Sequence, residues 1–332
     1  MRHLAIVLAL LIPACLAAHA AEAGGQITVA LLPKKKGLAY FTSCAQGAEA
    51  AAKELGNVKL IYDGPTDGSP EKAAAMIEKW TLKGVDVIAV SPNDPSVLAP
   101  AMRAAMAKGI RIITWDADGA PDTRAFFVNQ ATSQQIGEAM VDALAKDLAK
   151  DGGAPAGKVA IVTATLTAAN QNAWIEAMKV RLASTWPQLE LVAIKPCNED
   201  QKIAFQVAQD LMKAYPDLKG LFGISSVAFP GAAEAVKQAG KSGQVQVTGL
   251  STPNAMRNYV KDGTVRSVVL WNTRDLGYLT VLAARALVDG TLTAGATTFA
   301  AGSLGAKPVA GDQILLNNLL VFTKDNIDQF DF

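Results

Sequence analysis

The sequence predicts an α/β fold made of two lobes, each built on a doubly wound parallel sheet. Short aliphatic or β-branched runs alternate with Ala- and Lys-rich helical stretches from Gln26 onward, which is the pattern of successive βα units. The alternation occurs as two series, one on each side of Asn129. With 332 residues, of which 50% are hydrophobic, the chain exceeds the size at which a single core usually stops growing. We therefore expect two domains of the same architecture.

The first series predicts one doubly wound unit. Its strand-like runs are short and apolar, and helical stretches separate most of them. The expected strands are Ile27–Leu32, Val58–Tyr62, Val85–Val90, Ile110–Thr114 and Phe126–Val128, and the expected helices are Thr42–Leu55, Ser69–Lys83 and Pro95–Lys108.

The second series repeats this architecture. The expected helices are Ser133–Lys150, Asn172–Thr185, Gln201–Tyr215 and Pro230–Ala239, and the expected strands are Val159–Thr163, Leu189–Ile194, Gly220–Ile224 and Gln244–Leu250. A further strand, Val265–Trp271, is expected to pair with this second series, whereas the long helix Asp275–Asp289 is expected to pack on the first. The chain would then cross between the lobes more than once.

The first twenty residues predict an export signal peptide. Arg2 supplies the positive charge, Leu4–Ile12 the short apolar region and Ala18-His19-Ala20 the small-residue cleavage site. A membrane span is the alternative, but the apolar run is shorter than the roughly 20 residues that a helix needs to cross a bilayer. Cys15 offers a second alternative, a lipid anchor, which the preceding Pro13 disfavours. We expect an exported protein that starts after Ala20.

Removal of this signal leaves a chain without histidine and with balanced charge. It takes away both histidines, His3 and His19, and leaves 30 basic against 30 acidic residues. A near-neutral chain lacks the basic face that a nucleic acid or an anionic membrane surface would require. The remaining cysteines, Cys44 and Cys197, fall in different predicted lobes, so we expect two free, buried thiols.

Most catalytic and cofactor sites are excluded by the residues that are missing. Without histidine the exported chain has no Ser-His-Asp triad, no zinc motif of the H-E-x-x-H type and no Cys-His pair. No C-x-x-C or glycine-rich phosphate motif occurs, so we expect no metal and no cofactor. A glycosidase with two carboxylates remains open, although Asp116 and Asp118 on one loop are poorly arranged to flank a glycosidic bond.

Polar residues cluster directly after the predicted strands. In open α/β sheets a ligand lies beyond the carboxyl ends of the strands, so these positions are the candidate binding residues. They are joined by aromatic residues that could cover the C–H faces of a sugar ring. The candidates are Lys34, Tyr40, Phe41, Asp116, Asp118, Asn170, Gln171, Ser226, Ser251, Trp271 and Asn272.

Several candidates have a structural alternative. Lys34 begins a lysine run of the kind that usually forms a solvated loop, and Asn170 could be a helix N-cap. Trp115 and Trp271 could serve domain packing. Asp116 has the strongest case for function, because a carboxylate after an apolar strand is costly to bury without partners. Carboxylates, amides and lysines together suit hydroxyl groups.

Five motifs are spread along the chain, and a sixth segment, Asp325–Phe330, closes it. The five are Leu32-Pro33-Lys34 with Tyr40-Phe41-Thr42-Ser43, Tyr62-Asp63-Gly64-Pro65-Thr66, Thr114-Trp115-Asp116, Asn170-Gln171-Asn172 with Trp174, and Thr252-Pro253-Asn254-Ala255-Met256. Together they resemble the periplasmic type I sugar-binding proteins of ABC importers, especially the branch with rhamnose-binding proteins and autoinducer-2 receptors. The resemblance covers nearly the whole exported chain.

This resemblance implies a two-lobed clamp whose lobes are joined by three crossings, near Asn129, Asn272 and Asn317. An N-terminal lobe would comprise residues 26–129 and 273–317, and a C-terminal lobe residues 130–272 and 318–332. The implied protein is a periplasmic monomer and not an enzyme. It would close on a small sugar-like ligand and deliver it to the permease subunits of an ABC importer.

The resemblance also bears on the ligand. The autoinducer-2 pattern carries over at Lys34, Asp116 and Gln171. It departs at Asn170, where that family has an acidic residue, and at Ile224 and Ser226, where it has proline and alanine. The stretches around Asn170–Trp174 and Leu270–Asn272 are more similar to rhamnose-binding proteins. We expect a monosaccharide or related polyol, with a rhamnose-type sugar favoured and autoinducer-2 as the alternative.

Three rival functions stay open at this point. A sugar-responsive repressor would share the core, but it would carry a basic DNA-binding headpiece where this chain has an apolar signal. An exported glycosidase would turn over its substrate. A binding protein could also report to a chemoreceptor or sensor kinase instead of an importer, or do both.

Overall fold

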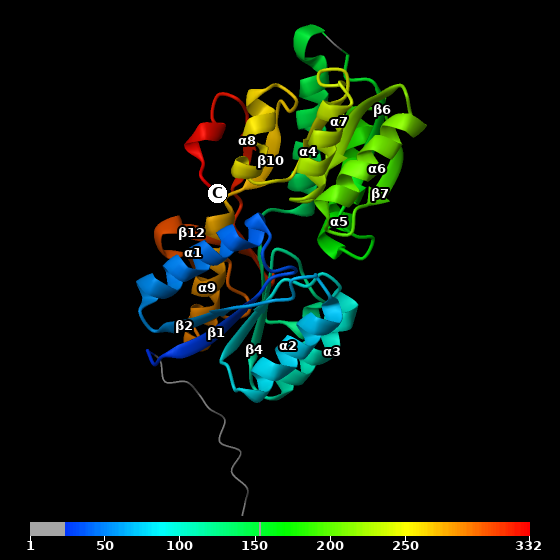
Figure 1. Cartoon of the computed structure of the whole chain (residues 1–332). Coiled ribbons are helices and arrows are strands. Elements are labelled where there is room, and N and C mark those ends of the chain that lie inside the picture. The colour runs from blue at the N-terminus through cyan, green and yellow to red at the C-terminus, as the bar shows by residue number, and fades with distance from the viewer. Residues whose placement is uncertain (1–23, 153) are drawn as a thin grey trace, which may run out of the picture.

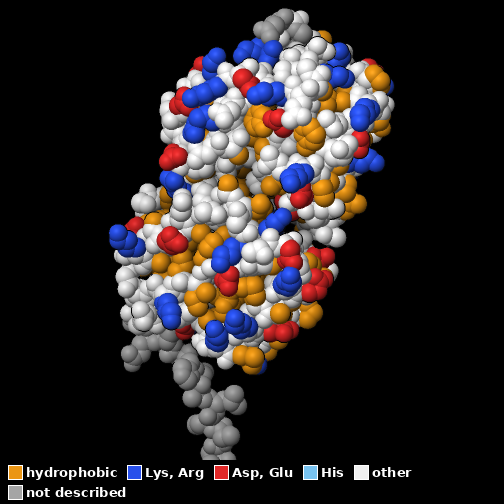
Figure 2. All heavy atoms as spheres, in the orientation of Figure 1, with side chains coloured by type: hydrophobic (Ala, Val, Ile, Leu, Met, Phe, Trp, Pro, Cys, Tyr) orange, Lys and Arg blue, Asp and Glu red, His pale blue; other side chains and the backbone are white. Residues whose placement is uncertain are grey.

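The computed structural model describes residues 24–152 and 154–332, which form two lobes placed end to end (Figure 1). The predicted signal peptide, residues 1–20, and Cys15 lie outside the described residues. No helix in the described part of the chain is long and apolar enough to cross a membrane. On the face shown in Figure 2, Lys/Arg and Asp/Glu side chains are interspersed over both lobes.

The first lobe is built on an eight-stranded sheet with the order β11-β12-β13-β5-β4-β3-β1-β2. Its strands from β13 to β2 run parallel, and β11, β12 and β13 form an antiparallel extension at one edge. The strands are β1 (Ile27–Leu32), β2 (Val58–Tyr62), β3 (Val87–Val90), β4 (Arg111–Trp115), β5 (Phe126–Asn129), β11 (Thr298–Ala300), β12 (Ala306–Ala310) and β13 (Gln313–Leu315).

Helices cover both faces of this sheet (Figure 1). The helices are α1 (Ala39–Leu55), α2 (Pro70–Leu82), α3 (Pro95–Ala107) and α9 (Thr273–Asp289), with short 3₁₀ turns at Pro121–Thr123 and Gly302–Leu304. Side chains of α2 and α3 pack with Ala30 and Leu32 on one face, while α1 and α9 pack with Val29 and Leu31 on the other. Alternate residues of β1 therefore serve different cores, as the two-residue period of a strand requires.

The second lobe has a parallel sheet with the order β7-β6-β8-β9, extended through the Leu250–Val269 bridge to the antiparallel pair β10-β14. Its strands are β6 (Gly157–Thr163), β7 (Leu189–Pro196), β8 (Leu218–Gly223), β9 (Gln246–Gly249), β10 (Val268–Trp271) and β14 (Leu319–Phe322). Its helices are α4 (Ser133–Ala149), α5 (Ala169–Thr185), α6 (Gln201–Ala214), α7 (Ala228–Gln238) and α8 (Pro253–Lys261), with 3₁₀ turns at Lys150–Gly152 and Ile327–Gln329.

The predicted fold class is confirmed, and the element boundaries shift by a few residues. Helix α5 begins at Ala169, three residues before the expected start, and β7 extends to Pro196. The sequence reading missed α8, which Thr252 caps by accepting from the Ala255 amide. It also missed the short strands after residue 297, whose few residues carry little periodic signal.

The chain passes between the two sheets three times. It leaves the first sheet after β5, returns after β10 and leaves again after β13. The first and third passages are hydrogen-bonded to each other: Leu316 donates its amide to the Asn129 carbonyl at 2.8 Å, and Asn317 donates to Gln130 at 3.0 Å. We propose these three passages as the hinge and the lobe boundaries given above.

The closest helix packing in the first lobe joins α1 to α9. A Cβ atom at Gly47 would lie 1.8 Å from the Arg274 carbonyl oxygen, and one at Gly277 would lie 1.8 Å from the Cys44 carbonyl oxygen. Cys44 and Cys197 are free and buried, as predicted. Because α9 begins directly after the second passage, the contact between α1 and α9 fixes the end of that passage against α1.

We expect Gly277→Ala to destabilise the protein. An alanine inside a helix normally stabilises relative to glycine, but here its methyl group would overlap backbone atoms of α1. The cost should be about 1–3 kcal/mol. Thermal unfolding measures it, and an unchanged or higher melting temperature would contradict the tight contact.

A second prediction concerns the buried carboxyl group of Asp147, which accepts a hydrogen bond from the Ser267 hydroxyl at 2.6 Å. Burial raises the pKa of Asp147 from its ordinary 3.8 to about 6, although Ser267 and Arg266 oppose the shift. The ionised form is therefore buried at a cost above pH 6, and that cost disappears as the pH falls through 3.8. Asp147→Asn should raise the free energy of unfolding by up to about 3 kcal/mol at pH 8 and not at pH 4.

Denaturant unfolding of both proteins at pH 4, 6 and 8 checks this expectation. A stability difference that stays constant across this range would show that the Asp147 carboxyl group does not titrate with a raised pKa.

Candidate functional site

A cavity of about 410 Å³, including its open mouth, lies where the carboxyl ends of the strands of both lobes meet. Residues of both lobes line it, so its shape depends on how far the lobes are closed. The lining residues are Lys34, Tyr40, Phe41, Asp116, Asn170, Gln171, Trp174, Glu199, Ile224, Ser225, Ser226, Leu250, Leu270 and Trp271.

Asp116 lies at the centre of the polar contacts. It follows β4 with a positive φ of 63°, a conformation that aspartate tolerates better than most residues, and it is 4% exposed. Its carboxylate accepts hydrogen bonds from the hydroxyl groups of Tyr40 and Ser91, each at 2.8 Å, and lies 3.4 Å from the Lys34 ammonium. These three partners offset the cost of burying the charge.

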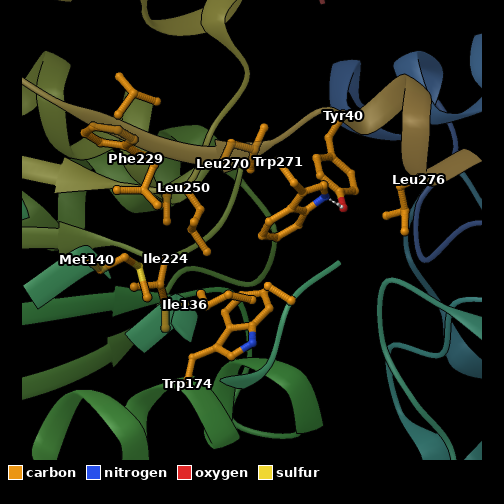
Figure 3. Close-up of a cluster of buried hydrophobic side chains, with 14 of the residues drawn as sticks. Tyr40, Ile136, Met140, Trp174, Ile224, Phe229, Leu250, Leu270, Trp271 and Leu276 are labelled. Atoms are coloured by element: carbon orange, nitrogen blue, oxygen red, sulfur yellow. Dashed lines mark hydrogen bonds between the residues drawn. The ribbon is translucent and has the colours of Figure 1, made fainter. Parts of the chain in front are cut away.

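Trp271 connects this carboxylate to the second lobe. The indole Nε1 of Trp271, at the end of β10, donates to the Tyr40 hydroxyl at 3.0 Å (Figure 3). Burial, together with the Asp116 carboxylate, raises the pKa of Tyr40 well above its ordinary value, so the phenol stays protonated and donates to Asp116. A buried chain of hydrogen bonds therefore runs from Trp271 at the end of β10, through Tyr40 on α1, to Asp116 after β4.

Lys34 and Asn170 make a second contact across the cavity. The Lys34 ammonium, 5% exposed, donates to Asn170 Oδ1 at 3.1 Å, so this lysine is not a solvated surface residue. Asn170 lies in the first turn of α5, whose N-cap is Ala168, so the alternative of an N-cap role is wrong. The Asn170 amide also approaches the Asp116 backbone carbonyl at 3.4 Å.

Gln171 is held by its own lobe. Its Oε1 accepts from the Thr163 hydroxyl at 2.6 Å and from the Ala164 amide at 2.8 Å. For its Nε2 amide, the described residues provide no hydrogen-bond partner, and Gln171 lines the cavity. The side chain can therefore donate to a bound molecule.

Aromatic side chains form the apolar wall. Trp174 and Trp271 lie 6.2 Å apart between ring centroids at an angle of 63°, and Tyr40 stands edge-on to Trp271 at 6.1 Å (Figure 3). Phe41 is nearly buried and packs edge-on to Trp115. Trp115 itself is fully buried and donates to the Ala89 carbonyl, which makes it a core residue and not a wall of the cavity.

Three predicted binding residues do not line this cavity. Asp118 is paired with Arg124 at 2.6 Å and accepts from Thr114, and it faces a neighbouring hollow instead. Ser251 is fully buried and donates to the Ser226 carbonyl at 3.0 Å. Asn272 is the N-cap of α9, which explains why an asparagine occurs there.

Sequence reasoning also missed residues that the fold brings to this place. Ser91 follows β3, and Trp174 lies one helical turn after Asn170; both could have been found from their position after a strand or within a singled-out motif. Ser225 was not missed: like Ser226, it directly follows the predicted strand Gly220–Ile224, and it lines the cavity. Glu199, in the loop after β7, gave no such signal. In the described part of the chain, no group of three or more His, Cys, Asp or Glu is placed to hold a metal ion.

Comparison with protein family models matches residues 29–292 to the family described as the periplasmic binding protein domain. The chain belongs to this family. Membership implies a periplasmic location and confirms the predicted resemblance at the level of the family. The D-allose-binding periplasmic protein of Escherichia coli K12 is 26% identical over 252 residues, which cover 72% of this chain and 77% of that protein.

Two solved structures of this periplasmic binding protein family are also similar. The LsrB protein of Clostridium saccharobutylicum, in complex with AI-2, is 27% identical with a TM-score of 0.88, covering 92% of this chain and 100% of that one. An ABC transporter solute-binding protein of Clostridium phytofermentas, with bound L-rhamnose, is 29% identical with a TM-score of 0.85, covering 92% and 98%. These relatives are binding proteins, and the two solved structures hold AI-2 and L-rhamnose, the ligands of the branch that the motifs indicated.

We expect Tyr40→Phe in this binding protein to cost stability. The change removes one hydroxyl and leaves both the Trp271 indole N–H and one Asp116 oxygen without their partner in a buried site. Each unsatisfied group should cost about 1–3 kcal/mol. Thermal unfolding measures the loss, and Tyr62→Phe is the control, because the described residues give the Tyr62 hydroxyl no hydrogen-bond partner. An unchanged melting temperature of Tyr40→Phe would contradict the hydrogen bonds that join Trp271, Tyr40 and Asp116.

Proposed function

We propose that this periplasmic binding protein captures a monosaccharide or similar polyol in the cavity between its lobes and delivers it to an ABC importer. The observation that carries the proposal is that one cavity is lined both by polar groups from the two lobes and by the indole rings of Trp174 and Trp271. Lysine, amide and serine groups can hydrogen-bond sugar hydroxyls, while indole rings cover the apolar C–H face of the ring.

Closure of the cavity gives the mechanism of capture. Lys34 and Asn170 come from different lobes and bond to each other, so both sides of the cavity are within reach of one small ligand. A ligand that contacts both lobes stabilises the closed state, because only that state makes both sets of contacts. The closed protein is the form that docks on the importer permease.

A rhamnose-type sugar is the favoured ligand. The L-rhamnose-binding relative supports it, and Asn170 supplies an amide where the autoinducer-2 pattern has an acidic residue. Autoinducer-2 is the second candidate, because the relative solved with AI-2 shares the fold closely and Lys34, Asp116 and Gln171 fit that pattern. The first candidate predicts tighter binding of a rhamnose-type sugar, and the second predicts tighter binding of autoinducer-2.

We also propose that the protein is a monomer without catalytic activity or cofactor. It is freed by cleavage after Ala20 and is not anchored through Cys15. A chemoreceptor or sensor kinase is a second partner that the closed form could engage. The relatives named above, which are binding proteins, support the assignment of a binding role and not an enzymatic one.

Thermal-shift screening against L-rhamnose, D-allose, D-ribose and autoinducer-2 tests the function. A ligand that binds only the folded protein raises its melting temperature. The proposal expects a sugar to give the largest shift. It fails if none of the four compounds shifts the melting temperature.

Asp116→Asn should weaken binding of the tightest sugar. The variant keeps the size of the side chain but removes the negative charge that holds Lys34 and Tyr40 in place, with a loss of about tenfold or more. Isothermal titration calorimetry measures the affinity. Asp122→Asn, at an exposed ion pair with Arg103 in the same lobe, is the matched control. Equal affinities of both variants would remove Asp116 from the site.

A further inference from the structure

Glu199 is the one residue with an ionisable side chain in the cavity lining that the sequence reading did not single out. It lies in the loop between β7 and α6, and it is half-buried. This loop is firmly placed: Cys197 donates its amide to the Thr163 carbonyl at 2.8 Å, and Asn198 donates to Ala164 at 2.7 Å. Glu199 therefore occupies a fixed position beside the end of β6.

The backbone of this loop is strained at Asn198 and Glu199. Asn198 and Glu199 both have positive φ, of 54° and 51°, a conformation that is uncommon for residues other than glycine. Glutamate gains nothing locally from this conformation, whereas asparagine tolerates it well. Such strain persists only where surrounding contacts maintain it, and it tends to occur at functional sites.

The carboxylate of Glu199 differs from that of Asp116 in having no bond of its own. Asp116 already accepts from Tyr40 and Ser91 and pairs with Lys34. For Glu199, by contrast, the described residues provide neither a hydrogen bond nor an ion pair to the side chain. Burial and the nearby Asp116 raise the pKa of Glu199, and Lys34 and Lys35 oppose the shift. The Glu199 carboxylate is therefore a strong hydrogen-bond acceptor in the cavity lining that remains available to a ligand.

A contact between the lobes, beside this cavity, joins the loop of Glu199 to the first lobe. The Lys35 ammonium, from the first lobe, donates to the Glu199 backbone carbonyl at 3.1 Å. Two carboxylates, Asp116 and Glu199, are then balanced by two ammonium groups, Lys34 and Lys35. A neutral ligand suits this balance better than an anion or a cation.

We propose that Glu199 binds the ligand and determines its specificity by accepting a hydrogen bond from a hydroxyl group of a neutral sugar. This inference rests on the proposed function, since it specifies how the same cavity selects its sugar. A half-buried carboxylate that lines the cavity and is left unpaired by the protein favours a ligand that donates to it, and it disfavours the analogue that lacks that hydroxyl.

Calorimetry with Glu199→Gln tests the proposal, using the tightest binder among L-rhamnose, D-allose and D-ribose as the probe. Gln keeps the shape and removes the charge, so affinity should fall about tenfold or more. Glu190→Gln is the matched control, because Glu190 is an exposed glutamate at the opposite end of β7. Its affinity should stay within about twofold of the wild type. Melting temperatures of both variants verify folding.

Monodeoxy analogues of the same sugar separate direct contact from an indirect effect on Lys34. One deoxy analogue should lose affinity in the wild type and show no further loss in Glu199→Gln, because the missing hydroxyl and the missing carboxylate belong to one interaction. Equal losses in both proteins for every analogue would overturn the assignment, as would unchanged affinity of Glu199→Gln. If the wild type binds none of the sugars, the proposed function itself fails, and the inference fails with it.

Discussion

The arrangement of the cleft depends on the burial of one charge, the Asp116 carboxylate. A carboxylate that loses its water must find other partners, and Asp116 finds them on three separate segments: Lys34 after β1, Tyr40 on α1 and Ser91 after β3. Tyr40 in turn accepts from Trp271 of the second lobe. The same set of bonds that satisfies the charge therefore also ties the first lobe to Trp271, next to the second passage between the sheets.

The contacts between the lobes differ between the back of the cavity and its mouth. Behind Tyr40, α1 and α9 meet through Gly47 and Gly277 with no room for a methyl group, and the first and third passages are hydrogen-bonded to each other. Towards the mouth, the lobes meet through two lysine contacts, Lys34 to Asn170 and Lys35 to Glu199. Long, flexible lysine side chains can break and re-form such bonds.

The sequence predicts the fold and part of the site because both follow from periodicity. Lys34 and Asp116 stand directly after clearly aliphatic strands, and parallel strands end at one edge. Asp118 lies outside the lining of this cavity, because the fold brings Arg124 to its carboxylate, a contact that periodicity does not encode. Glu199 could not be predicted from the sequence for a different reason. It follows a strand that runs past its apolar part to Pro196, and its loop has two residues with positive φ, which sequence periodicity does not encode.

The central claim is that a sugar binds between the two lobes against Trp174 and Trp271. A crystal structure of the protein with the tightest-binding sugar tests it most directly. The account predicts the sugar ring in this cavity, with hydroxyl groups within hydrogen-bond distance of side chains from both lobes and with the bond from Trp271 to Tyr40 intact. A sugar bound outside the cavity, or contacted by one lobe alone, would contradict it.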